Sequence, residues 1–200
     1  MEVLQPQTNL KRLGEIISSY IGTKTSSSLS MILNEPVSHR VRKVVEVESF
    51  DLGSITPVFD IIPMCSVYLK GEGDVHVTIV FFLPSSMAKK FAAKLLGIEK
   101  MNKLSSLGRS SISEVGNMMA GSFFNALSDG TGFRVEMSTP GFAADTFKAL
   151  IESPTTELAT TTDRFIITEA ELHGAESDII IEALILLSPT DAKKIIDAQK

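Results

Sequence analysis

Residues 108–128 read GRSSISEVGNMMAGSFFNALS. With about 100° of rotation per residue, an α-helix over this stretch separates its apolar residues from a narrow row of polar and small ones. The apolar side carries Ile112, Val115, Met119, Phe123, Ala126 and Leu127. The opposite side carries Ser110, Glu114, Asn117 and Gly121, which we call the polar stripe. The stretch therefore predicts a long helix that buries one face and exposes this stripe.

Two interpretations of the polar stripe are open. A helix face that meets solvent has to carry polar residues, so the stripe needs no function. A hydroxyl, a carboxylate and a carboxamide one turn apart, beside a glycine, also suit a surface that binds and acts on a partner. No histidine, lysine or cysteine accompanies them to activate a hydroxyl, so the stripe is a poor nucleophilic site and a better site for positioning a water molecule.

The spacing of the polar stripe extends to a proline. The pattern Ser110-x3-Glu114-x2-Asn117-x22-Pro140 resembles the Asp/Ser-x3-Glu-x2-Asn-x22-Pro signature of the CheC, CheX and FliY family of response-regulator phosphatases. The neighbouring Gly116-Asn117 and Ala126-Leu127-Ser128 also resemble the helix of that family, and the order of elements resembles it over nearly the whole chain. The length and duplicated layout are most similar to stand-alone CheC.

This resemblance implies an activity and a role for each residue. The expected activity is hydrolysis of the aspartyl phosphate of a CheY-like response regulator in chemotaxis. Asn117 is expected to hold the attacking water and Glu114 to pair with the active-site lysine of the receiver domain. Ser110 is expected to support the helix start, Pro140 to shape the adjacent loop, and Gly121 either to admit the partner or to pack on the chain's own sheet.

The resemblance also sets expectations about cofactors and partners. It implies no cofactor for this chain and Mg²⁺ in the partner receiver domain, with a CheD-like deamidase as a further candidate partner. An alternative function is that of a non-catalytic module that docks a receiver or a CheD-like deamidase, or of an adaptor related to the flagellar switch. The chain lacks room for the extra C-terminal domain of FliY and FliM, which favours a stand-alone protein.

Composition excludes several other classes of protein. The 200 residues are 44% hydrophobic and 22% charged, with a net charge of −5 and no basic cluster longer than Arg40-Val41-Arg42-Lys43, which argues against nucleic-acid binding. The single Cys65 excludes an internal disulfide and, among apolar neighbours, predicts a small buried side chain. Three scattered histidines predict no metal site. Without a signal-like start or a long apolar run, the chain is expected to be cytoplasmic, with no membrane partner.

Along the chain, periodicity and turn residues predict helices and strands in a repeated order. The predicted elements of the first half are a helix Asn9–Asn34 capped by Asn9, a strand Val37–Val47, a connection Phe50–Pro63, a hairpin of Met64–Lys70 with Val75–Leu83, and a helix Met87–Leu96. A linker Ile98–Gly108 precedes the long helix. The second half then continues with a turn Asp129–Gly132, a strand Phe133–Met137, a helix Ala143–Ile151, strands Arg164–Leu172 and Asp178–Leu187, and a helix from Thr190.

The two halves, about 8–100 and 101–200, also match in residues. Ser28-Leu29-Ser30 parallels Ala126-Leu127-Ser128, and Ala88-Lys89-Lys90-Phe91 parallels Ala192-Lys193-Lys194-Ile195. We therefore predict one duplicated α/β (α+β) domain over residues 1–200, with a pseudo-twofold axis, a mostly antiparallel sheet and two long equivalent helices outside. The first copy keeps Glu15 but has Lys11 and Ser18 (or Ser19) where the second has Ser110 and Asn117, so we predict that its site is degenerate and inactive.

Overall fold

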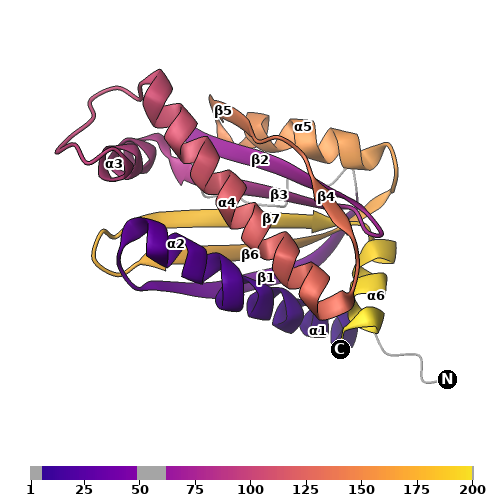
Figure 1. Cartoon of the computed structure of the whole chain (residues 1–200). Helices are drawn as coiled ribbons and strands as arrows, with labels where there is room; N and C mark the ends of the chain where they lie inside the picture. Colours follow the sequence, from indigo (N-terminus) through magenta and orange to yellow (C-terminus); the bar gives the residue numbers. More distant parts are fainter. Residues whose placement is uncertain (1–5, 49–61, 200) are drawn as a thin grey trace.

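A computed structural model describes residues 6–48 and 62–199 and shows one antiparallel sheet with helices on both faces (Figure 1). The connection predicted over Phe50–Pro63 lies almost entirely outside the described residues. The elements in chain order are α1 (Pro6–Tyr20), a π-helical turn η1 (Ile21–Thr25), α2 (Ser26–Leu33), β1 (Val37–Glu48), β2 (Met64–Gly73), β3 (Val77–Pro84), α3 (Ser85–Leu95), α4 (Ser106–Thr131), β4 (Val135–Met137), β5 (Gly141–Asp145), α5 (Phe147–Ala159), β6 (Arg164–Gly174), β7 (Ile180–Leu187) and α6 (Pro189–Ala198). Within these residues, none of the helices has the length and apolar character needed to cross a bilayer.

The strand order of the sheet is β1-β6-β7-β3-β2-β4, and β5 also pairs with β2. Every pairing is antiparallel. At each edge of the sheet, a strand of one half of the chain pairs with a strand of the other half: β1 pairs with β6, and β4 and β5 pair with β2. The prediction of a mixed α/β fold with a mostly antiparallel sheet is confirmed. The strand order is symmetric about the middle of the sheet: β1 corresponds to β4 and β5 at the other edge, β6 corresponds to β2, and β7 corresponds to β3.

Two hydrophobic clusters fill the space on either side of the sheet. The larger one joins the inner faces of α1, α2, α3, α4 and α6 to one side of the sheet. The smaller one lies under α5 on the other side and includes Phe82, Phe147 and Phe165. Figure 1 shows α4 crossing the outer face of the larger layer, and no helix or strand of the described residues covers its outward side.

Three predicted boundaries in the first half and around α4 are wrong. The first helix is already formed at Pro6, whose fixed φ suits a first helical turn, so Asn9 is not its cap. α4 begins two residues before Gly108, at a cap formed by the hydroxyl of Ser105. The predicted turn Asp129–Gly132 is helical as far as Thr131, and the helix ends only at Gly132, which has a positive φ of 80°.

The predicted helix Ala143–Ile151 is also wrong, because its first residues form a strand. Residues 141–145 pair with Tyr68–Met64 along the outer edge of β2, and these hydrogen bonds hold them in extended conformation. The helix α5 starts only at Phe147, after Thr146, whose hydroxyl accepts a hydrogen bond from Ala149 N. The hairpin of β2 and β3 and the strands β6 and β7 agree with the prediction.

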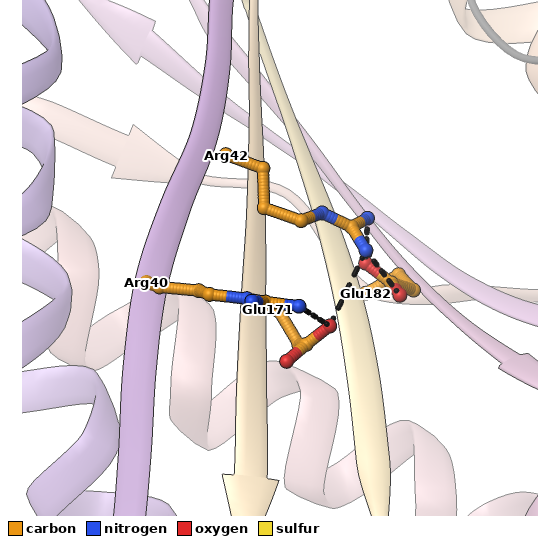
Figure 2. A network of polar contacts seen from close by, with 4 residues as sticks. All are labelled: Arg40, Arg42, Glu171 and Glu182. Atoms are coloured by element: carbon orange, nitrogen blue, oxygen red, sulfur yellow. Dashed lines mark hydrogen bonds and ion pairs between the residues drawn. The ribbon is translucent and has the colours of Figure 1, made fainter.

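The basic run Arg40–Lys43 does not form a free basic patch. In Figure 2, Arg40 of β1 reaches Glu171 of β6, and Arg42 reaches both Glu171 and Glu182 of β7. Arg42 Nη1 lies 3.0 Å from Glu182 Oε1, and the second guanidinium nitrogen also pairs with this carboxylate. Burial raises the pKa of Glu182, and Arg42 partly opposes this shift. The two arginines thus have carboxylate partners within the sheet.

Glu35, between α2 and β1, is a buried acid that links three elements. Its carboxylate accepts a hydrogen bond from Ser177 in the β6–β7 connection, and Lys94 Nζ of α3 lies 3.3 Å from Oε2 as an ion pair without hydrogen-bond geometry. Burial alone would raise the pKa of Glu35, but the contacts with Ser177 and Lys94 lower it below its ordinary value of 4.5. The carboxylate therefore stays charged at neutral pH.

We expect Glu35 to contribute to the loss of stability in acid. Since its pKa in the folded state lies below that of the unfolded chain, its contribution is complete above about pH 4.5 and is lost as the pH falls through the folded-state pKa. Glu35→Gln should lower the free energy of unfolding at pH 7 by about 1–3 kcal/mol and flatten its decline in acid. Denaturant titrations between pH 3 and 7 measure both effects, with exposed Glu99→Gln as the control. Parallel pH profiles for the wild type and Glu35→Gln would contradict this role.

Candidate functional site

α4 presents the polar stripe because its other side is fixed in the core. All six residues predicted for the apolar face are buried: Ile112, Val115, Met119, Phe123, Ala126 and Leu127. Ser110 and Glu114 are exposed, and Asn117 and Gly121 are partly exposed. The predicted two-sided helix is therefore confirmed, and the four stripe residues lie together on its outer side.

The polar side chains of the stripe have no partner within the described part of the chain. Other serines of α4, Ser111, Ser113 and Ser122, donate to backbone carbonyls four residues earlier. Ser110, Glu114 and Asn117 make no side-chain hydrogen bond or ion pair with any residue that the structure describes. Their hydroxyl, carboxylate and carboxamide are thus available to a molecule that approaches from outside.

Two glycines of α4 have different surroundings. A Cβ atom on Gly116 would lie 2.6 Å from Val67 Cγ1 of β2, whereas one on Gly121 would have only Met137 Cε nearby, at 3.8 Å. Gly116 therefore allows α4 to pack closely on the sheet, and Gly121 does not have this role. The close packing on the sheet that was one expectation for Gly121 is thus found at Gly116, whose place beside the apolar Val115 in the sequence could have indicated it.

This difference predicts opposite effects of two alanine substitutions. Gly116→Ala should lower the free energy of unfolding by about 1–3 kcal/mol, because the added methyl group overpacks the contact with Val67. Gly121→Ala should leave it unchanged or raise it by up to about 1 kcal/mol, since alanine favours a helix and the site has room. Chemical denaturation of the two variants tests the pair, and equal destabilisation would contradict the packing described here.

Pro140 lies between β4 and β5, at a shallow surface hollow of about 480 Å³. Ser138 anchors this turn on β2, because its backbone N donates to Lys70 O at 2.8 Å and its hydroxyl accepts from Lys70 N at 3.0 Å. Met137 lines the same hollow and is the residue nearest to Gly121. The turn that carries Pro140 is therefore connected with the Gly121 end of the stripe through Met137.

The first copy of the stripe is occupied by the chain itself. Glu15 is exposed, as Glu114 is, but Ser18 Oγ lies 3.5 Å from Nε2 of His39, which belongs to β1. The same imidazole lies against Gly22, where a Cβ atom would be 2.5 Å from His39 Cε1. His39 thus covers in the first half the positions that correspond to Asn117 and Gly121, a contact that the sequence analysis did not predict.

Neither stripe offers a metal site. Within residues 6–48 and 62–199, no three His, Cys, Asp or Glu side chains gather closely enough to hold a metal ion. The polar groups that α4 itself offers to a partner are therefore those of Ser110, Glu114 and Asn117.

Comparison with known proteins agrees with the resemblance found in the sequence. Residues 107–143, which include the stripe and Pro140, match the model of the CheC-like family. The CheY-P phosphatase CheC of Bacillus subtilis (strain 168) is 25% identical over 190 residues, which cover 90% of this chain and 86% of that protein.

Solved structures resemble the chain in fold. FliY of Thermotoga maritima matches with a TM-score of 0.75 and 21% identity over 98% of both chains. A FliM middle domain from H. pylori matches with a TM-score of 0.63 and 12% identity, covering 98% of this chain and all of that one. CheX in the CheX-CheY-BeF3-Mg complex of Borrelia burgdorferi matches with a TM-score of 0.56 and 17% identity, covering 87% and 97% of the two chains. The chain is therefore CheC-like in sequence over residues 107–143 and in fold over nearly its whole length.

Proposed function

We propose that this protein is a phosphatase that hydrolyses the aspartyl phosphate of a CheY-like response regulator, with Asn117 and Glu114 as its catalytic residues. The observation that carries the proposal is the placement of Ser110, Glu114 and Asn117 on the open side of α4, one turn apart and without partners in the described chain. Two comparisons support it. The Bacillus subtilis relative is a CheY-P phosphatase, and a structural relative is a CheX bound to CheY.

The proposed chemistry is the positioning of water. The carboxamide of Asn117 accepts a hydrogen bond from the attacking water through its oxygen and donates to a neighbouring acceptor through its nitrogen. The water oxygen attacks the phosphorus in line with the aspartyl oxygen, the P–O bond to the aspartate breaks, and the products are inorganic phosphate and a free carboxylate. This is comparable to the role of a water-orienting glutamine in the small GTPases. Mg²⁺, expected in the receiver, supplies charge stabilisation on the partner's side.

Glu114 also positions the partner in this proposal, and Ser110, Gly121 and Pro140 contribute to docking. Glu114 forms an ion pair with the lysine in the receiver's active site and so fixes the orientation of the partner. Ser110 supports the contact near the start of α4, and Pro140 shapes the turn that ends at β5. Gly121 allows close approach, since among the described residues outside its own helix only Met137 comes within 4 Å of the place that a Cβ atom would take.

A non-catalytic docking function is the alternative, and the fold likeness to FliM favours it, because the solved FliM relatives include a complex with FliG. The two functions differ in phosphate release. Candidate receivers are phosphorylated with a small-molecule donor, and phosphate release is followed with and without this protein. Acceleration supports hydrolysis, whereas receiver binding without acceleration supports the docking function. A CheD-like partner and a cytoplasmic location stay predictions, which co-purification and fractionation of cells can test.

We expect the first half to contribute structure and not catalysis. Ser18 is in contact with His39 and has no amide, and Lys11 places a positive charge where the second half has Ser110. Ser18→Ala and Ser19→Ala should therefore change phosphate release by less than about twofold. A loss as large as that of an Asn117 variant would reveal a second working site.

A further inference from the structure

The segment that leads into α4 is strongly basic. Residues 85–109 contain six lysines and arginines and one acidic residue, Glu99, in a chain whose net charge is −5. The basic residues are spread over α3, the connection to α4 and the first turn of α4, so they form no compact run in the sequence: Lys89, Lys90, Lys94, Lys100, Lys103 and Arg109. The fold brings four of them, all lysines, to one surface.

Lys89, Lys90, Lys94 and Lys100 line a surface hollow of about 610 Å³, which we call the lysine hollow. Lys94 is paired with buried Glu35. The other three make no ion pair or side-chain hydrogen bond with any described residue. Glu99 also lines the hollow, but it forms no ion pair with these three lysines. Unlike Arg40 and Arg42, they are therefore not paired with a carboxylate of the described chain.

An exposed apolar side chain lies in the hollow, and a second one lies at the start of α4. Ile98 lines the lysine hollow and is 46% exposed, and Leu107, in the first turn of α4, is 61% exposed. Exposed aliphatic side chains among unpaired charges are typical of a protein-binding surface. A phosphate or another small anion would use the lysines but would leave Ile98 and Leu107 without a role.

The lysine hollow has a fixed position relative to the polar stripe. Gly108 of α4 packs so closely on the preceding segment that a Cβ atom would lie 3.1 Å from Met101 Sδ and 3.2 Å from Ala92 Cβ of α3. Met101 and Leu104 pack on the main core. The connection between α3 and α4 is thus held in place, and Figure 1 shows it beside the first turns of α4.

We infer that the lysine hollow, with Ile98 and Leu107, docks an acidic surface of the phosphorylated receiver next to its phosphoryl group. This inference rests on the proposed function. Asn117 lies eleven residues into α4, or roughly 17 Å from its start, and a domain of about 100 residues has a radius of gyration of about 13 Å. A uniform sphere with this radius of gyration has a radius of about 17 Å. A receiver centred over Asn117 therefore extends to the start of α4, where Gly108 packs on Met101 and on Ala92 of α3. The part of the receiver that meets the hollow is expected to be acidic, because it faces three lysines that have no partner in the described chain.

The test compares charge reversals at matched exposed lysines. Lys90→Glu and Lys100→Glu should each raise the KM for the phosphorylated receiver by about three- to tenfold without changing kcat, because docking charges act on encounter rather than on the chemical step. Lys148→Glu, on α5 across the sheet, makes the same change in net charge and should have no effect. The difference should shrink at 0.5 M salt. Equal KM values for all three variants would overturn the inference.

Direct binding separates this inference from the proposed function. If the wild type releases no phosphate from any receiver but binds one with an affinity that Lys90→Glu and Lys100→Glu reduce, the proposed function fails and the docking surface stands. If hydrolysis is normal and both variants bind the receiver as the wild type does, the docking surface fails alone. Binding of RNA or of anionic vesicles through these lysines, without competition from the receiver, would also overturn it.

Discussion

Asn117→Ala should reduce phosphate release from the phosphorylated receiver by about 100-fold or more while the fold stays intact. A group positioned at the reacting atoms contributes on the order of 10²–10³ in rate, and no other carboxamide of the polar stripe can replace it. Asn117 is partly exposed and has no partner among the described residues, so its loss removes no contact from the fold. Alanine is also a better helix former than asparagine, by a few tenths of a kcal/mol.

The matched control is Asn125→Ala, which removes the same side chain from an exposed position of the same helix. It should keep wild-type turnover, and both variants should keep the wild-type thermal midpoint. Single-turnover release of phosphate at saturating protein measures the chemical step without a contribution from binding. Wild-type turnover by Asn117→Ala would remove Asn117 from the proposed mechanism.

Glu114→Lys should weaken binding of the phosphorylated receiver more than any other single change on α4. If Glu114 meets a lysine that is partly shielded from water, the substitution opposes two like charges at a cost of several kcal/mol. Glu114→Gln keeps the shape and loses only the ion pair, so its effect should be smaller. Raised salt should narrow the gap between the variants, because part of the contact remains open to solvent. Receiver affinity for the three forms, measured at two salt concentrations, tests the order.

The control for the change of charge is Glu152→Lys, at an exposed position of α5 on the other side of the sheet. It should bind the receiver as the wild type does. None of the three substitutions should change the free energy of unfolding by more than about 0.5 kcal/mol, since Glu114 has no partner among the described residues. Equal affinities of all forms for the receiver would support the simpler interpretation, in which the polar stripe is only a solvated helix face.

The sequence predicted correctly those helices and strands whose conformation depends on residues close to them in the chain. The two faces of α4 follow from helical periodicity, and the β2–β3 hairpin follows from alternation around a Gly-rich turn. Residues 141–145 could not be predicted in this way. Their extended conformation comes from pairing with β2, about 75 residues away in the chain, and the alanines among them have no strong preference for a strand.

The same distinction applies to the candidate site. Ser110, Glu114 and Asn117 are four and three residues apart, so they lie on one face of any α-helix that contains them. The contacts of His39 with Ser18, of Met137 with Gly121 and of the lysines around one hollow depend on how strands and connections pack in three dimensions. No spacing in the sequence indicates them.

The π-helical turn η1 has a consequence for how the two long helices are related. Glu15 and Glu114 are 99 positions apart, whereas Leu29 and Leu127 are 98 apart, so the first helix contains one residue more between the matched points. One extra residue in a regular α-helix rotates everything after it by about 100° and would turn Leu29 away from the core. A π turn takes up a single added residue in one wider turn. Thus η1 accommodates the one residue by which the first helix is longer and keeps Leu13 and Leu29, on either side of it, both in the core.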